Sequence, residues 1–266
     1  YLDAFTTLLA DTSEQTKLRA LQGLHQWKES VSMEITTAVA QHLYSENPLL
    51  RQAAAGCLHL VNEPGRSKLL LLAIGDGHIR VREAGIAILK STSENYTDQA
   101  LTWIKGNTAS LRAQQTLLTS ILNEPLAKSV FADIARTKSA EILLLQDAHA
   151  TFARENRSTG NTARSLLQHT LKEQLDQTIE LVLLALEPLY DSETIRIVHA
   201  GFSSGDSRHI ANACEVLENL GKDAMISNLS DALQRSAGGN FEPDGQDFTS
   251  IDDVLHWCAE HGNSWL

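Results

Sequence analysis

An apolar pattern with the period of an α-helix recurs about every 31 residues through the first half of the chain. Within one copy the apolar residues stand at i, i+3, i+4, i+7, i+8 and i+11, which places them on one stripe of a helix. A repeat of this length holds two helices, and a single helical pair cannot bury its apolar faces alone. The pattern therefore predicts an all-α fold in which helical hairpins stack on one another. The aligned starting positions of the five copies are Leu18, Leu50, Val81, Leu111 and Ile142.

A shorter apolar segment precedes each later stripe, and turn signals separate the two. In the second copy the turn contains Asn47-Pro48, which suits an N-cap followed by the first helical position. In the third and fourth copies, Gly75 and Gly106 suit a left-handed residue at a helix end. No alternating strand pattern of useful length is present, so each repeat is expected to be a helical hairpin. The preceding segments are marked by Ile35–Leu43, Leu69–Ile74, Ala100–Ile104 and Val130–Ala135.

The repeat period changes after Phe152, and this change divides the chain into two expected regions. Residues 1–155 are expected to hold the repeats with a period of about 31. Residues 156–266 are expected to continue as irregular helical repeats. A polar loop over 154–160 should separate the two regions, and a long helix should follow it and end before Pro188.

The last part of the chain has the composition of a loop followed by an incomplete repeat. Three glycines and a proline predict a surface loop over 237–250. An amphipathic helix over 251–259 follows, and a second helix begins at Trp265-Leu266, where the sequence stops. We therefore expect the last repeat to be truncated and the parent protein to continue beyond it.

The net charge argues against nonspecific binding to nucleic acid. The chain has 22 basic and 33 acidic residues, for a formal charge of −11. A chain of this charge repels a phosphate backbone. No nucleic-acid partner is therefore expected.

The apolar runs indicate a soluble chain, and the cysteines do not require an oxidising compartment. Cys57, Cys214 and Cys258 are far apart and form no CxxC pair, and the first two lie on apolar helix stripes. The most apolar runs, Leu69–Ile74 and Ile179–Leu186, are far shorter than the ~20 residues that a membrane span needs.

An arginine follows the first apolar position in four of the five repeats. Arg19, Arg51, Arg82 and Arg112 form this ladder, and Leu143 breaks it. Guanidinium groups spaced in this way can line a groove and hold carboxylates or phosphates, so Arg51, Arg82 and Arg112 are the candidate binding residues. The alternative is structural: each arginine pairs with an acidic or carbonyl group in its own or a neighbouring turn. Recurrence at the period of the fold favours the structural interpretation.

The segment from Gly201 to Gly205 fits the G-x-S-x-G pattern around a nucleophilic serine, Ser203. A nucleophile elbow needs a strand before the serine and a helix after it. The preceding segment, Glu193–Phe202, has a helical pattern. A turn between two helices is therefore the favoured interpretation, and no catalytic residue is predicted.

Histidines and cysteines do not form a complete metal site in the sequence. His256, Cys258 and His261 lie close together, but no second pair with ligand spacing accompanies them. His25 and His149 occupy repeat-core positions and are expected to be buried or half-buried structural residues. No metal and no cofactor are predicted.

The second repeat resembles the HEAT-repeat family. The segment Asn47-Pro48-Leu49-Leu50-Arg51-Gln52-Ala53-Ala54 is similar to the second-helix motif of that family, in which Asn or Asp, Pro, an apolar residue, Arg and Ala follow one another. The third repeat departs from the motif by an insertion between Asp76 and Val81, and the fifth lacks the arginine. The resemblance covers roughly the first 155 residues and implies a HEAT-like α-solenoid.

A narrower resemblance covers about 100 residues of the second half. These segments are similar to the soluble helical-repeat region of bacterial membrane proteins that carry an ATP/ADP-translocase-like or major-facilitator-like transporter part. The resemblance carries over no catalytic or ligand residues. It rests on Ser165–His169, Glu180–Leu184, Leu189-Tyr190, Gly201–Asp206, Ala211–Leu220 and Val254–Leu266.

These resemblances imply a non-catalytic scaffold or regulatory module of a nucleotide-transporter-like membrane protein, acting by protein–protein recognition. The module would lie in the cytoplasm, tethered to the inner membrane through a part N-terminal to Tyr1. Its partner would be another protein or a neighbouring domain of the same chain. A free cytosolic adaptor that binds proteins or peptides is the alternative. A HEAT-like phycobilin lyase or DNA glycosylase is a further one, and the acidic charge opposes the glycosylase.

The charge generates the first testable prediction. At moderate salt the chain should give no retarded band with a duplex DNA probe in a gel-shift assay, because a charge of −11 repels the duplex. Tight binding that weakens steeply with salt would reveal a basic groove that the net charge conceals.

Overall fold

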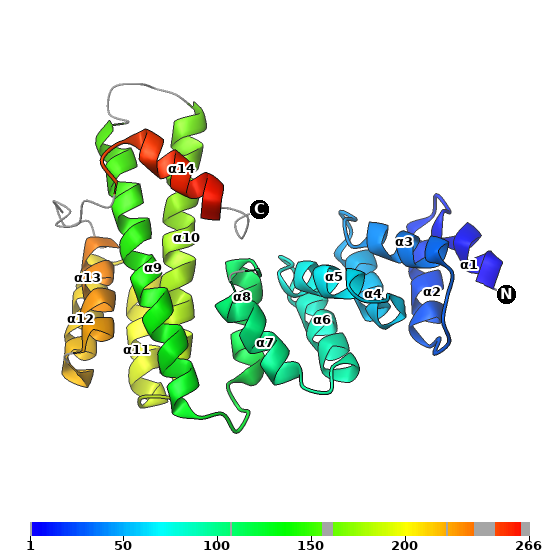
Figure 1. Cartoon of the computed structure of the whole chain (residues 1–266), viewed down its shortest axis with the longest axis horizontal. Coiled ribbons are helices and arrows are strands. Elements are labelled where there is room, and N and C mark those ends of the chain that lie inside the picture. Colours follow the sequence, from blue (N-terminus) through cyan, green and yellow to red (C-terminus); the bar gives the residue numbers. More distant parts are fainter. Residues whose placement is uncertain (1, 107, 156–161, 222, 237–247, 262–266) are drawn as a thin grey trace. The chain divides into compact units, whose positions relative to one another are not determined.

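The computed structural model of the chain describes residues 2–106, 108–155, 162–221, 223–236 and 248–261 (Figure 1). Most of these residues are helical, the rest lie in turns, bends or irregular segments, and none of them forms a strand. The prediction of an all-α fold is therefore confirmed. The chain divides into two compact units, residues Tyr1–Ile121 (the N-unit) and Leu122–Leu266 (the C-unit). No helix within the described ranges is both long enough and apolar enough to cross a membrane.

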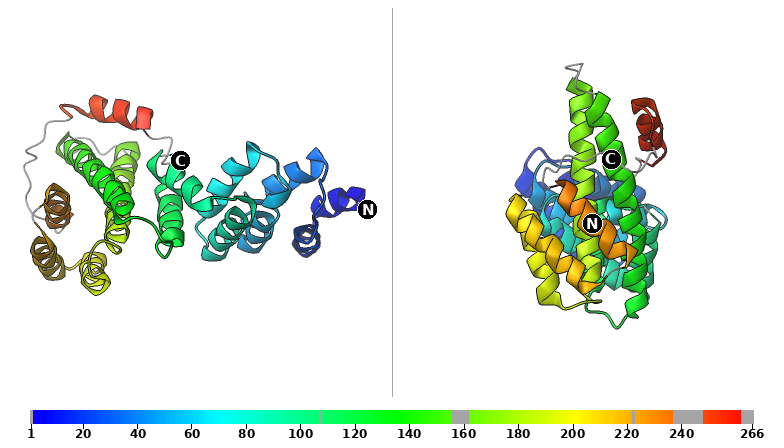
Figure 2. Two further views of the ribbon diagram at one scale, coloured as in Figure 1. Left: turned by 60° about the horizontal axis from the view of Figure 1, so that its bottom comes forward. Right: turned by 90° about the vertical axis from the view of Figure 1, so that its left-hand side faces the viewer.

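The N-unit is a succession of helical pairs. Helices α2, α4, α6 and α8 contact one another in that order, and each also contacts the helix that precedes it in the chain. The left-hand view of Figure 2 shows this succession from a second direction. The elements are α1 (Leu2–Leu9), α2 (Glu14–His25), α3 (Met33–His42), α4 (Pro48–Gly56), the 3-10 helix η1 (Leu58–Leu60), α5 (Gly65–Ile74), α6 (Ile79–Thr92), α7 (Tyr96–Lys105) and α8 (Leu111–Ile121).

The repeated apolar stripe forms the core of the N-unit. Leu50, Val81 and Leu111 are at most 4 % exposed, as the period predicts, whereas Leu18 is half-buried. Two apolar helices must approach closely where α5 and α6 meet. A Cβ atom added at Gly85 would stand 2.9 Å from Cγ1 of Ile74, so only glycine allows this approach.

The helix ends follow the sequence signals in part. Asn47 caps α4, since its side chain accepts the Leu49 N–H at 2.9 Å and Pro48 opens the helix. Gly75 and Gly106 do end α5 and α7, but with φ of −88° and −80° they are not left-handed, so that prediction is wrong. Gly75 lies in a crowded position instead, because a Cβ there would lie 2.7 Å from Oγ of Ser110 and would force that hydroxyl to move.

The C-unit is built around two long neighbouring helices, α9 and α10 (Figure 1). Three shorter helices continue from them in series: α11 contacts α10 and α12, and α13 contacts α12 and returns to α9. Helix α14 also packs on α9. The elements are α9 (Lys128–Glu155), α10 (Thr162–Leu186), α11 (Ser192–Ser203), α12 (Ser207–Leu220), α13 (Ala224–Ser236) and α14 (Ile251–His261).

The fifth predicted hairpin does not exist as two helices. Val130–Ala135 and the stripe that begins at Ile142 belong to the single helix α9, which also extends through Glu155 into the predicted loop. No glycine or proline interrupts residues 128–155, so nothing in that segment ends the helix. The rest of that loop, most of the predicted loop at 237–250 and the expected truncated end at 262–266 lie outside the described residues.

Backbone contacts hold the start of α14 on α9. The carboxylate of Asp147 accepts the Phe248 N–H at 3.1 Å, and the hydroxyl of Thr151 donates to the Phe248 carbonyl at 3.4 Å. Both side chains are at most 5 % exposed. The ring of Phe248 meets that of Trp257 edge to face, with centroids 5.5 Å apart.

Candidate recognition groove

Arg51 joins two successive turns of the N-unit. Its Nη1 donates to the carbonyls of Ser45 at 2.8 Å and Glu46 at 3.0 Å, in the turn before α4. Its Nε and Nη2 donate to the two carboxylate oxygens of Asp76, at 2.7 and 3.0 Å, in the turn before α6. The guanidinium is therefore held by a bidentate ion pair and two carbonyls.

Arg82 repeats part of this arrangement one hairpin later. Its Nη1 donates to the carbonyls of Asp76 at 2.9 Å and Gly77 at 3.2 Å, which lie six and five residues before it. The carbonyls bound by Arg51 have the same offsets. Arg112 is exposed and lies beside Gly77. The contacts of Arg51 and Arg82 favour the structural interpretation of the ladder, and ligand binding by Arg51, Arg82 and Arg112 stays a prediction.

The ion pair shifts the titration of both partners. The hydrogen bonds to Asp76 raise the pKa of Arg51 above its usual value. Burial acts to raise the pKa of Asp76, but hydrogen bonds from Arg51 and from the His78 N–H together hold it below its usual value. Asp76 therefore contributes to stability as a carboxylate.

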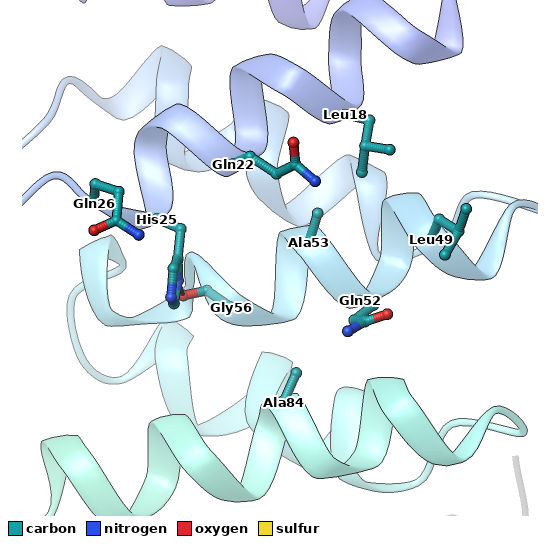
Figure 3. Close-up of a pocket in the computed structure, with 9 residues that line it drawn as sticks. All are labelled: Leu18, Gln22, His25, Gln26, Leu49, Gln52, Ala53, Gly56 and Ala84. Carbon is teal, nitrogen blue, oxygen red and sulfur yellow. Dashed lines mark hydrogen bonds between the residues drawn. The ribbon is translucent and has the colours of Figure 1, made fainter.

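A groove of about 380 Å³ lies across α2 and α4 and reaches α6 (Figure 3). Its wall on α2 consists of residues at i, i+4, i+7 and i+8, which share one face of that helix and its C-cap. The α4 residues supply the opposite wall and part of the floor. The lining residues are Leu18, Gln22, His25, Gln26, Leu49, Gln52, Ala53, Gly56 and Ala84.

His25 closes one end of the groove. Its Nδ1 donates to the Gly56 carbonyl at 2.7 Å, because a carbonyl oxygen can only accept. The ring lies so close to α4 that a Cβ at Gly56 would stand 3.1 Å from Nδ1. His25 is exposed rather than a core residue, so its predicted burial is wrong, whereas His149 is half-buried as expected. Burial and, to a lesser extent, Lys172 lower the pKa of His149.

The polar groups of the groove are amides rather than charges. Gln22, Gln26 and Gln52 line it, and within the described part of the chain none of their side chains has a hydrogen-bond partner. These residues were not predicted, because the periodic signal lies in the apolar stripe and not in the helix face beside it. The signal that could have found them is the glutamine pair four residues apart, at Gln22 and Gln26.

The G-x-S-x-G segment is a turn between two helices. Ser203 is the last residue of α11, so no strand precedes it and the geometry of a nucleophile elbow is absent there. Each glycine has a structural reason. A Cβ at Gly201 would lie 2.8 Å from the His209 carbonyl oxygen, and Gly205 has a left-handed φ of 65°.

His256 and Cys258 lie on α14. His256 on α14 pairs with Glu260 one turn later, with Nε2 and Oε1 3.2 Å apart. Burial raises the pKa of Cys258 to about 11. Among the residues whose placement is described, no group of three His, Cys, Asp or Glu side chains could hold a metal ion. The side chain of His261 lies outside that set.

Comparison with known protein families, with characterised proteins and with solved structures finds no match. The HEAT-like and transporter-like resemblances therefore stay expectations from the sequence.

The ion pair between Arg51 and Asp76 generates a prediction about stability. Replacing Arg51 by alanine should lower the free energy of unfolding by roughly 2–3 kcal/mol, since a half-buried charged pair and two carbonyls lose their partner. Arg51→Lys should recover only part of this, because lysine cannot reproduce the bidentate fork. Urea unfolding measures both, and Arg80→Ala, an exposed arginine of α6, is the control and should change little.

The same pair predicts a dependence on pH. The folded pKa of Asp76 is lowered, so its contribution is complete above the unfolded value of about 4 and is lost as the pH falls through the folded value. The stability difference between the wild type and Asp76→Asn should therefore be largest near pH 7 and shrink steadily as the pH falls below about 4. A difference that stays constant over this range would show that the carboxylate is not what stabilises the turn.

Substitutions in the G-x-S-x-G segment test whether its residues serve the packing of the turn or a catalytic serine. Gly201→Ala should lose about 1–3 kcal/mol of stability through overpacking, and Gly205→Ala about 1–2 kcal/mol through its left-handed backbone. Ser203→Ala should stay within about 0.5 kcal/mol of the wild type. A serine-directed fluorophosphonate should not label the wild type, and stoichiometric labelling at Ser203 would restore the hydrolase hypothesis.

Proposed function

We propose that this chain is a HEAT-like α-solenoid module that recognises another protein through the groove on α2, α4 and α6 and has no catalytic activity. The observation that carries the proposal is the groove itself, with an apolar floor and three side-chain amides that lack partners among the described residues. Buried apolar contact with a few orienting polar groups is typical of recognition sites.

Contacts between successive hairpins support the solenoid arrangement in the N-unit. Three side chains bind a carbonyl about one repeat away along the chain, and all three contacts join the first hairpin to the second. His25 binds Gly56, His59 binds Trp27 with Nε2 2.9 Å from the oxygen, and the thiol of Cys57 donates to Leu21 at 3.1 Å. Each contact has nearly the period of the sequence pattern, as expected of nearest-neighbour stacking.

The nucleophilic side chains support a non-catalytic role. Burial raises the pKa of Cys57 to about 12, so its thiol is protonated and unreactive at neutral pH. Burial also raises the pKa of Cys214. Ser203 has the structural setting of a helix end, as described above.

On the sequence resemblance alone, we further propose that the module belongs to a nucleotide-transporter-like membrane protein and works on its cytoplasmic side. A free adaptor is the alternative. In either case the contact surface would be the same groove, so one experiment addresses both.

Photo-cross-linking tests recognition through the groove. A photo-cross-linking amino acid at Gln52 of the full chain, expressed in its source cells, should give a discrete adduct with one polypeptide. The same amino acid at the exposed Thr37 on α3, which does not line the groove, should not. Adding Ala53→Arg should remove the adduct, because the larger side chain fills the floor.

Two outcomes would contradict the proposed function. One is the absence of any adduct at Gln52. The other is an adduct that survives Ala53→Arg in a protein whose circular dichroism and thermal unfolding match those of the wild type.

A further inference from the structure

Two amides on the α2 wall are spaced like the backbone of an extended polypeptide. Gln22 and Gln26 are four residues apart, which is about 6 Å along a helix. Gln26 keeps helical dihedrals as the C-cap of α2, with φ of −84° and ψ of −8°. Alternate residues of an extended chain are about 6.4–6.8 Å apart and present their backbone groups to the same side. An extended segment along α2 can therefore meet both amides in succession.

The three amides suit a main chain as their partner. Each glutamine amide offers one acceptor and two donors, and each peptide unit offers one of each. Gln52 extends from α4 toward α6 (Figure 3), so it offers a third amide to a segment that crosses α4. A helical segment would have satisfied its own main chain already. It would bury the three amides without partners, which is unfavourable.

The floor of the groove allows a close approach of backbone. Ala53, Gly56 and Ala84 carry little or no side chain, and Leu18 and Leu49 extend the apolar surface. Side chains of an extended segment alternate between its two faces. Every second residue of the occupant would thus face this floor, which fits small or apolar side chains.

The charge distribution offers no complement to a strongly charged occupant. None of the nine lining residues is Asp, Glu, Lys or Arg. Residues 1–121 contain 11 basic and 11 acidic residues, so the N-unit is formally neutral, and residues 122–266 contain 11 basic and 22 acidic residues. The whole net charge of −11 therefore belongs to the C-unit, and the groove has no charge to complement an ionic ligand.

We propose that the groove binds an uncharged, extended segment of a partner polypeptide, held through its main chain by Gln22, Gln26 and Gln52. This inference rests on the proposed function and names the form of the partner. The apolar side chains of the segment lie over Ala53 and Ala84, and His25 marks the end of the binding site.

The experiment uses the full chain and a display library of random nonapeptides. Enriched peptides are synthesised with blocked termini, and their dissociation constants are measured by fluorescence anisotropy. Enriched sequences should lack charged residues at their centre and carry small or apolar residues at alternate positions. Gln22→Ala and Gln26→Ala should each weaken binding by about 3- to 10-fold. Gln15→Ala, an exposed glutamine of α2 outside the groove, should have no effect.

A second measurement tests the role of the main chain. N-methylation of the peptide at alternate residues removes backbone donors from one side at a time. Methylation of the backbone nitrogens on the side that faces the glutamines, at every second residue, should abolish binding. Methylation at the residues in between should not.

The outcomes separate this inference from the proposed function. The enriched peptides could instead carry charged residues, or apolar residues at helical spacing, and still fail to bind Ala53→Arg. That result would overturn the extended, uncharged conformation of the bound segment while leaving recognition by the groove in place. Binding that survives methylation at each of the two sets of alternate residues would likewise overturn only the extended conformation of the bound segment. If no peptide is enriched, or if enriched peptides bind Ala53→Arg as well as the wild type, the inference and the proposed groove both fail.

Discussion

The structure of the N-unit depends on the contact between one helical hairpin and the next. A pair of short amphipathic helices buries too little apolar surface to be stable in water, so each pair needs a neighbour. Here α2, α4, α6 and α8 meet in order, and the stripe that begins at Leu50, Val81 and Leu111 is buried between them. Gly85 allows α5 and α6 to approach to a distance that any Cβ would prevent. Apolar packing thus sets the order of the hairpins.

Polar side chains fix the register of this packing. Apolar contact is not directional, so it does not by itself prevent one hairpin from sliding along the next. Arg51 binds Ser45 in the turn before its own helix, α4, and Asp76 in the turn before α6. His25, at the other end of its helix, binds the carbonyl of Gly56 in α4. The His25 contact joins α2 to α4 at one end of the groove, and the Arg51 contact joins the second hairpin to the third.

The sequence predicts what depends on local periodicity and fails where tertiary contacts decide. The stripes and the Asn47 cap are properties of a few neighbouring residues, so α2, α4, α6 and α8 could be predicted. Helix α9 could not be distinguished from two helices, because its apolar pattern weakens near Thr137 without any residue that would end a helix. The sequence predicted a left-handed backbone at Gly75. The structure instead places Gly75 against the side chain of Ser110, 35 residues away, which a local pattern cannot reveal. The glutamines of the groove escape prediction because an exposed amide leaves no periodic signal.

The extent of the groove follows from one aligned position in successive repeats. Ala53 in α4 and Ala84 in α6 stand three residues after Leu50 and Val81, and both lie in the floor. The aligned residue in α8 is Gln114, which is 1 % exposed and donates through Nε2 to the Ala109 carbonyl at 2.8 Å. A long polar side chain therefore occupies the place of the small floor residue, and its Oε1 is buried without a hydrogen-bond partner among the described residues. Burying such an atom is unfavourable, and the long side chain keeps α8 from continuing the small-residue floor of the groove. The small floor residues are confined to the second and third repeats, which limits the length of the groove.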